Sequence, residues 1–127
     1  MLRLSLGVAI GSAIGGVLRF WLTSYAARVL PHHLPLGTIL INVAVSFAIG
    51  VVAASTVSRP GAFGGPMGHQ ILMTGVFGGF TTFSAFSLQT LLLAQDGRWV
   101  LAIANVALSI ALCLLAVAAG WHVGRAL

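Results

Sequence analysis

Four long apolar segments limit what this chain can fold into more than any other feature. They cover residues 4–27, 37–55, 71–93 and 99–121. Each approaches or exceeds the roughly 20 residues that a helix needs to cross the hydrocarbon core of a bilayer. Charged residues make up only 6 % of the 127 residues, whereas soluble domains carry about a quarter. We therefore predict one all-α membrane domain, 1–127, with four transmembrane helices.

The spans contain none of the features that a membrane enzyme needs. They hold no carboxylate pair, no nucleophile beside a base and no zinc-binding spacing. The single acid, Asp96, lies in the last connection, so no buried carboxylate can cycle a proton against a substrate. The scattered arginines form no basic stripe for a nucleic acid. We expect no enzyme activity and no catalytic residues, and we expect only lipid and other copies of the chain as partners.

The arginines near the ends of the spans are divided almost evenly between the two sides of the membrane. One side would carry Arg3, Arg59 and Arg125, and the other Arg28 and Arg98. Because membrane orientation follows the arginine and lysine bias of short loops, so weak a bias allows insertion both ways. Four thin helices also enclose little interior, which favours an oligomer. We predict an antiparallel, dual-topology homodimer.

The third apolar segment contains a stretch, 75–87, that is too rich in glycine and hydroxyl groups to face lipid. Its sequence is GVFGGFTTFSAFS. In hydrocarbon a helix can be interrupted only where protein, water or an ion satisfies the backbone. We predict that the third helix is broken at its centre, at the glycine pair 78–79, and that Phe80, Phe83 and Phe86 stack along one side. Such breaks expose carbonyls that can coordinate sodium and amide ends that favour anions.

Polar side chains elsewhere in the spans are candidates for an ion pathway. Asn42 is the strongest polar group of the second span, and Asn105, Ser109 and Cys113 follow one face of the fourth. Such an asparagine often makes only an interhelical hydrogen bond, although it could also line the pathway. Arg19 is the only formal charge within a span, and we interpret it as a positive element at the mouth of an anion path. Extension of its side chain towards the headgroups is the alternative.

A small hydrated anion needs replacement hydrogen-bond donors that also let it leave. The hydroxyls of Thr81, Thr82, Ser84 and Ser87 can donate, and phenylalanine rings have electropositive edges. These groups, with an amide, predict a surface suited to a small anion.

Two other motifs have simpler interpretations. Gly7, Gly11 and Gly15 recur at four-residue spacing, which predicts close packing against another helix. His32 and His33 lie in the first connection between two prolines. Adjacent histidines could bind a metal, but no further ligand is near in sequence, so we interpret this connection as a solvated loop.

Three motifs together resemble the Fluc or CrcB family of fluoride channels. They are GVLRF at 16–20, Gly37-Thr38 followed by Asn42, and the pattern G-x-x-G-G-x-T-T-F-S-x-F at 75–86. The resemblance covers essentially the whole chain. It implies an antiparallel, dual-topology dimer in the cytoplasmic (inner) membrane of a prokaryote, with two pores and a central sodium ion. It also implies passive fluoride exit that lowers the fluoride concentration of the cytoplasm.

The same resemblance implies roles for individual residues. The backbone carbonyls of Gly78 and Thr81, from both subunits, would hold a structural sodium ion. Two phenylalanines would turn their ring edges to fluoride, Asn42 and Ser84 would donate hydrogen bonds, and Arg19 would lie near a vestibule. The predicted ion-pathway residues, including one hydroxyl of the fourth span, are Arg19, Asn42, Phe83, Ser84, Phe86 and Ser109.

Two residues depart from the family's pattern. Ala85 stands where threonine is usual, and Cys113 where a hydroxyl is common. If the two face one another, they would weaken the polar track and slow the passage of fluoride.

Two other functions fit parts of the sequence. A small dual-topology multidrug exporter would match in size and charge balance, but it would need an acid within the membrane. A non-transporting assembly subunit is what the glycine spacing alone would allow.

Overall fold

The structure, a computed structural model of residues 1–127, consists of helices and short connections. The third apolar segment is divided into several pieces, whereas the other three are continuous helices. In chain order the elements are α1 (Leu2–Val29), α2 (Leu36–Ser58), the 3₁₀ turn η1 (Ala62–Gly64), α3 (Gly65–Gln70), the π-helical run η2 (Ile71–Phe77), α4 (Gly78–Phe80), α5 (Phe83–Gln95) and α6 (Trp99–Ala126). Four segments are long and apolar enough to cross a membrane, which confirms the predicted all-helical fold with four spans.

Prolines set the ends of the first two helices. Both helices extend beyond their predicted apolar segments, and each ends two residues before a proline, Pro31 or Pro60. The residue before a proline is pushed out of the helical region by the proline ring. Leu30 is accordingly extended, with φ −99° and ψ 152°.

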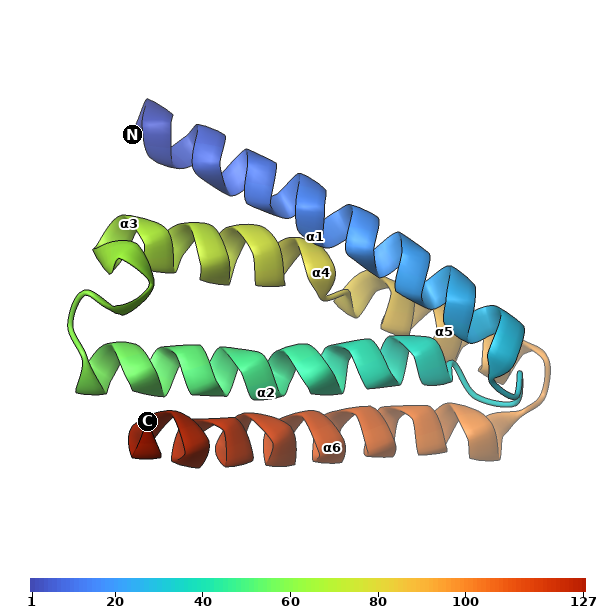
Figure 1. The fold of residues 1–127 in the computed structure, drawn as a ribbon. Helices are drawn as coiled ribbons and strands as arrows, with labels where there is room; N and C mark the ends of the chain where they lie inside the picture. The colour runs from blue at the N-terminus through green and yellow to red at the C-terminus, as the bar shows by residue number, and fades with distance from the viewer.

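The four spans form a bundle in which the broken segment is covered by α1. Figure 1 shows α2 and α6 running side by side, with α3 to α5 along the other side of α2 and α1 crossing obliquely over them. Both chain termini lie at the same end of the bundle, as an even number of spans requires.

Glycines allow the backbones of neighbouring helices to approach closely. On α1, a Cβ added at Gly15 would lie 2.8 Å from the Phe80 backbone nitrogen, and one added at Gly11 would lie 3.2 Å from the Gly75 Cα. The predicted close packing of this glycine face is therefore confirmed, and its partner is the broken segment of the same chain. The α2–α6 pair uses the same device, because a Cβ at Gly50 would meet the backbone of Gly120 at 3.1 Å.

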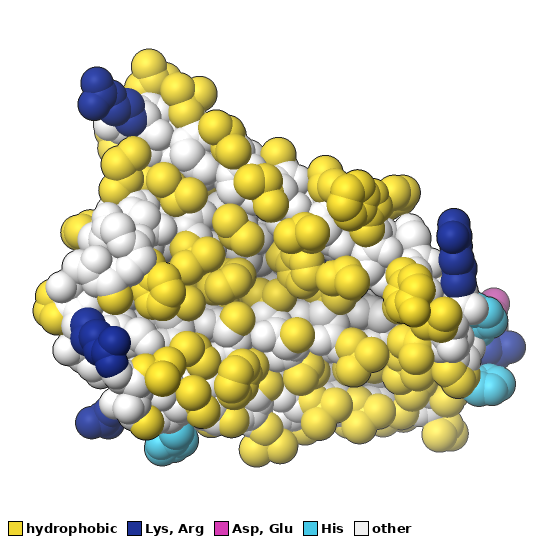
Figure 2. All heavy atoms as spheres, viewed as in Figure 1, with side chains coloured by type: hydrophobic (Ala, Val, Ile, Leu, Met, Phe, Trp, Pro, Cys, Tyr) yellow, Lys and Arg dark blue, Asp and Glu magenta, His cyan; other side chains and the backbone are white.

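The outer surface is apolar except at its two ends. Only 17 of the 127 residues are buried, so most of the large hydrophobic side chains point away from the bundle. Figure 2 shows apolar side chains over the whole middle of one face, with charged and histidine side chains at the two ends. This arrangement fits a protein whose middle lies in hydrocarbon and whose ends lie in water.

The interruption of the third span lies at Thr81 and Thr82, so the prediction of a break at the glycine pair 78–79 is wrong. Gly78 is helical, with φ −62° and ψ −40°, and α4 continues through both glycines. The chain then becomes extended at Thr81 (φ −80°, ψ 158°) and Thr82 (φ −152°, ψ 110°). Gly79 is needed for another reason, because its added Cβ would lie 2.8 Å from the Cα of Ser12 on α1.

Candidate ion pathway at the helix break

One side chain satisfies both backbone groups of Thr82 at the break. The Asn42 Nδ2 group donates to the Thr82 carbonyl oxygen over 3.3 Å, and the Thr82 amide donates to Asn42 Oδ1 over 3.2 Å. Asn42 comes from α2, so it supplies across the bundle the hydrogen bonds that the interrupted helix lacks. Asn42 therefore stabilises the interruption of the helix at Thr82.

The Thr82 side chain begins the next helix. Its Oγ1 accepts a hydrogen bond from the Ala85 amide over 3.1 Å, in the manner of a helix N-cap, and lies 3.3 Å from the Ser84 Oγ. The first amides of a helix have no intrahelical partner, and the helix dipole makes this end positive. The N-terminal end of α5 thus presents positive potential at the break.

Arg19 turns towards the break rather than towards the end of α1. Its side chain is half-buried, and its Nη1 donates to the Thr81 carbonyl oxygen over 3.2 Å. The extended path to the headgroups, the alternative considered for this arginine, is therefore not the conformation that the structure adopts. A second positive group lies at the break as a result.

Two carbonyls beside the break lack the helical amide that would normally bond them. The amide four residues after Gly78 is that of Thr82, which donates to Asn42. The amide four residues after Thr81 is that of Ala85, which donates to the Thr82 hydroxyl. The Gly78 carbonyl is left for another partner, and the Thr81 carbonyl has only Arg19. The Gly78 carbonyl is of the unbonded kind that suits a cation, whereas the Thr81 carbonyl already accepts from Arg19. The backbone at Gly78 thus fits the sodium site that the family resemblance implies.

A cavity of about 350 Å³, here called the break cavity, opens beside the interruption. Its wall is formed by α2, the interruption itself, α5 and α6. It brings together four of the six predicted pathway residues, whereas Arg19 and Ser84 do not line it. The main lining residues are Asn42, Ser46, Thr82, Phe83, Phe86 and Ser109.

The two cavity phenylalanines form a pair. The ring centroids of Phe83 and Phe86 lie 5.3 Å apart, with the ring planes tilted by 45°. Phe80 does not extend this stack, because it ends α4 on the other side of the interruption and does not line the cavity. The Phe83 side chain is 78 % exposed, so most of this ring is not covered by the chain.

Several of the predicted hydroxyl donors are already used within their own segments. The Thr81 hydroxyl donates to the Phe77 carbonyl over 3.0 Å, and the Ser87 hydroxyl donates to the Phe83 carbonyl over 2.9 Å. The donors left to the cavity include the second N–H of the Asn42 amide and the hydroxyls of Ser46 and Ser109. The Ser109 hydroxyl has only a long contact of 3.5 Å, to Asn105 Oδ1.

The polar line on α6 is divided between packing and cavity. Asn105 is fully buried, and its Nδ2 donates to Thr90 Oγ1 of α5 over 2.9 Å, so it links two helices. Cys113 lines the break cavity. Ala85 does not, so the two departures from the family's pattern do not meet in this cavity.

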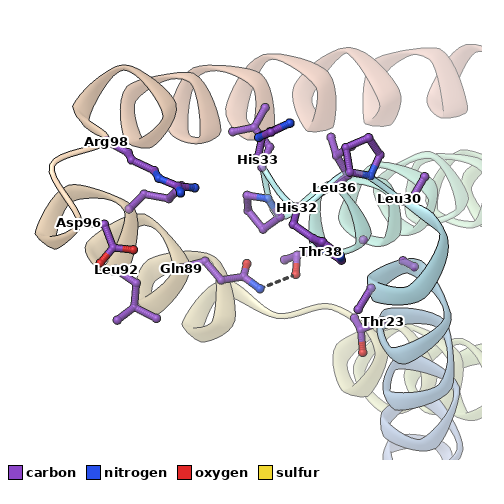
Figure 3. Close-up of a pocket in the computed structure, with 17 residues that line it drawn as sticks. Thr23, Leu30, His32, His33, Leu36, Thr38, Gln89, Leu92, Asp96 and Arg98 are labelled. Carbon is purple, nitrogen blue, oxygen red and sulfur yellow. Dashed lines mark hydrogen bonds between the residues drawn. The ribbon is translucent and has the colours of Figure 1, made fainter.

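A second cavity of about 350 Å³, here called the mouth cavity, lies at the end of the bundle where α1 passes into α2 and α5 into α6 (Figure 3). At its inner end Gln89 Nε2 donates to Thr38 Oγ1 over 3.0 Å, and Gln89 Oε1 is buried without a partner. Gln89 is not among the residues predicted from the sequence. Its position three residues after Phe86 continues the spacing of the two cavity phenylalanines, and that spacing could have indicated it. The polar and charged residues that line the mouth cavity include His32, His33, Thr38, Gln89, Asp96 and Arg98.

Comparisons with known proteins agree on one family. Residues 6–121 match the family model described as "CrcB-like protein, Camphor Resistance (CrcB)". A relative from Paramagnetospirillum magneticum, named fluoride-specific ion channel FluC, is 53 % identical over 87 % of this chain and 86 % of its own length. Relatives from Rhodopseudomonas palustris (FluC 2) and Rhodospirillum rubrum (FluC) are each 46 % identical over 94 % of this chain and 92 % of their own. The chain therefore belongs to the CrcB-like protein family.

Proposed function

We propose that the chain is a fluoride-specific ion channel that lets fluoride leave the cell passively and is not an enzyme. The observation that carries this function is the break cavity, in which an amide, several hydroxyls and two phenylalanine rings meet without any acid. The hydrogen-bond donors of the cavity replace part of the water around a small anion, and the electropositive ring edges add attraction without a deep trap. The names of the relatives point to the same ion.

The positive groups at the break support an anion as the permeant species. The Arg19 guanidinium and the N-terminal end of α5 both lie there, and the chain's only acid, Asp96, lies in the connection to α6. An exporter that exchanges protons needs a carboxylate within the membrane, so this composition disfavours the multidrug-exporter alternative.

Ion efflux from liposomes tests this function. Vesicles that contain the purified chain and are loaded with potassium fluoride should release fluoride when valinomycin carries the potassium out. Matched vesicles loaded with potassium chloride should stay near the leak of protein-free vesicles. Equal release of both anions would exclude fluoride specificity, and no release of either would leave the assembly subunit as the better function.

We infer that two oppositely oriented copies form the working channel in the bacterial inner membrane. The exposed Phe83 ring and the exposed Gly78 lie beside the break, so a second subunit there would complete the wall of the pathway. The nearly even arginine distribution supports insertion both ways.

Labelling from outside tests this topology. In a Cys113→Ser background, a single cysteine in place of Leu127 should react to about one half with a membrane-impermeant maleimide, because the two orientations are equally populated. Permeabilised cells, in which every copy should react, provide the control. Labelling of all copies or of none in intact spheroplasts would exclude dual topology.

We also propose that the carbonyls of Gly78 and Thr81 hold a structural sodium ion where the two subunits meet. Neither carbonyl has its helical amide, as described above. When bound, the ion supplies positive charge that the backbone at the break does not itself carry.

Because a ligand stabilises the state that binds it, replacing sodium by choline at equal ionic strength should lower the melting temperature of the detergent-solubilised protein. The sodium concentration would be varied from zero to roughly 300 mM, about the range of salt used in common assays. A melting temperature that did not change over this range would contradict the sodium site.

A further inference from the structure

The mouth cavity continues the line of the break cavity towards the end of the bundle. On α2, Thr38 lines the mouth cavity and Asn42, one helical turn later, lines the break cavity. On α5, Phe86 lines the break cavity and Gln89 the mouth cavity. The Thr38–Gln89 hydrogen bond therefore lies at the end of the mouth cavity that is nearer to the break cavity.

The outer end of the mouth cavity carries four ionisable side chains. They are His32 and His33 from the first connection, and Asp96 and Arg98 from the connection between α5 and α6 (Figure 3). Arg28 lies nearby in the last turn of α1 but does not line the cavity. With neutral imidazoles the aspartate and the arginine offset each other. Each imidazole adds one positive charge to this cavity when it is protonated.

The Gln89 amide lies at the inner end of the same cavity. Depending on its orientation, it can offer either an acceptor or a donor to a further partner. As assigned, Gln89 Nε2 donates to the Thr38 hydroxyl and Oε1 remains without a partner. The two ends of a glutamine amide are assigned from their hydrogen bonds. With the amide turned over, Oε1 accepts from the Thr38 hydroxyl and the N–H groups take the place of the unpartnered acceptor. In that orientation the orphaned acceptor becomes a donor, and an anion can satisfy it.

We propose that the mouth cavity is a binding site for a small inorganic anion, and that protonation of His32 and His33 strengthens the binding. The protonated imidazoles and Arg98 attract the anion at the outer end, and the Gln89 amide donates to it at the inner end. Asp96 opposes the binding, which keeps the site weak while both imidazoles are neutral. That the mouth cavity is the entrance to the ion pathway rests on the proposed channel function. Anion binding in the cavity does not depend on that function.

Linkage between anion and proton gives a direct test. If protonated histidines bind the anion, the anion must in turn favour protonation. The full chain, in an uncharged detergent without phospholipid and with isotope-labelled histidine, is titrated by NMR in sodium fluoride and in sodium gluconate at equal ionic strength. The midpoints of His32 and His33 should move to higher pH in fluoride by about 0.5 pH unit, the shift expected when fluoride is at about twice the dissociation constant of the protonated site.

The other two histidines are internal controls. His69 lies in α3 and His122 in α6, near the opposite end of the bundle, and neither lines the mouth cavity. Their midpoints should be the same in the two salts. Equal movement of all four midpoints, or movement of none, would overturn the proposal. Because phospholipid is absent, a headgroup phosphate cannot produce the selective shift.

A pair of double variants provides the second measurement. Fluoride should shift the Gln89 side-chain amide resonances at pH 6, and His32→Gln with His33→Gln should reduce this shift at least about threefold, because the imidazolium charges are gone. His69→Gln with His122→Gln should leave it unchanged. An unreduced shift in the first double variant would contradict the site.

Fluoride efflux from liposomes without any of these NMR effects would refute the site and leave the channel function intact. The NMR effects without fluoride efflux would refute only the channel function.

Discussion

Replacing Asn42 by leucine should lower fluoride efflux from liposomes by about 100-fold. The substitution removes both hydrogen bonds to the backbone of Thr82 and leaves an amide and a carbonyl unpaired beside the break. Each unpaired buried group costs about 1–3 kcal/mol. A combined cost of about 3 kcal/mol would depopulate this arrangement of the interruption roughly 100-fold. The variant would also lose the one amide that faces the break cavity.

Ser46→Ala is the matched control for this substitution. Ser46 lies one helical turn from Asn42 and lines the same cavity, but it does not bond the backbone at the break. We expect its efflux to fall by no more than about fivefold, because one net hydrogen bond is worth about 1 kcal/mol, equivalent to a factor of about five. If Asn42→Leu and Ser46→Ala lowered efflux equally, Asn42 would be only one polar wall residue among several and would not hold the break.

The position of the break shows why composition locates an interruption less well than hydrogen bonding does. The glycine pair 78–79 suggested the break because glycine weakens helices. Both glycines are nevertheless helical, and Gly79 serves the close approach of Ser12 on α1. The chain leaves the helix where Asn42 and the Thr82 hydroxyl offer its backbone other partners. The sequence contains both residues, but nothing in it places α2 opposite position 82.

Contacts across helices account for the other differences from the predicted site. The spacing of small residues along α1 predicted its packing face, because helical periodicity fixes which residues share a face. Periodicity does not fix how a neighbouring helix is rotated or how far it is displaced. Ser84 therefore remains exposed outside the break cavity, and Gln89 meets Thr38 without having been predicted to do so.

Replacing Phe83 by isoleucine should also lower fluoride efflux on the order of 100-fold, equivalent to about 2.7 kcal/mol in the barrier, while the protein still folds. An aliphatic side chain has no electropositive edge, so a fluoride ion that has given up water would meet no compensating potential there. Folding should tolerate the change because the Phe83 side chain is 78 % exposed in the subunit and its only aromatic partner is Phe86.

Phe20→Ile separates the ring chemistry of Phe83 from the general loss of an exposed aromatic residue. Phe20 lies on α1, is 66 % exposed and does not line the break cavity. Both variants should elute from a sizing column as the wild-type protein does, and only Phe83→Ile should lose efflux. Because the cavity wall would stay intact and apolar in Phe83→Ile, near-normal efflux from that variant would mean that hydroxyl and amide donors suffice. The anion would then be stabilised at the break by Asn42, Ser46 and Ser109 alone, and the two rings would serve only to exclude lipid.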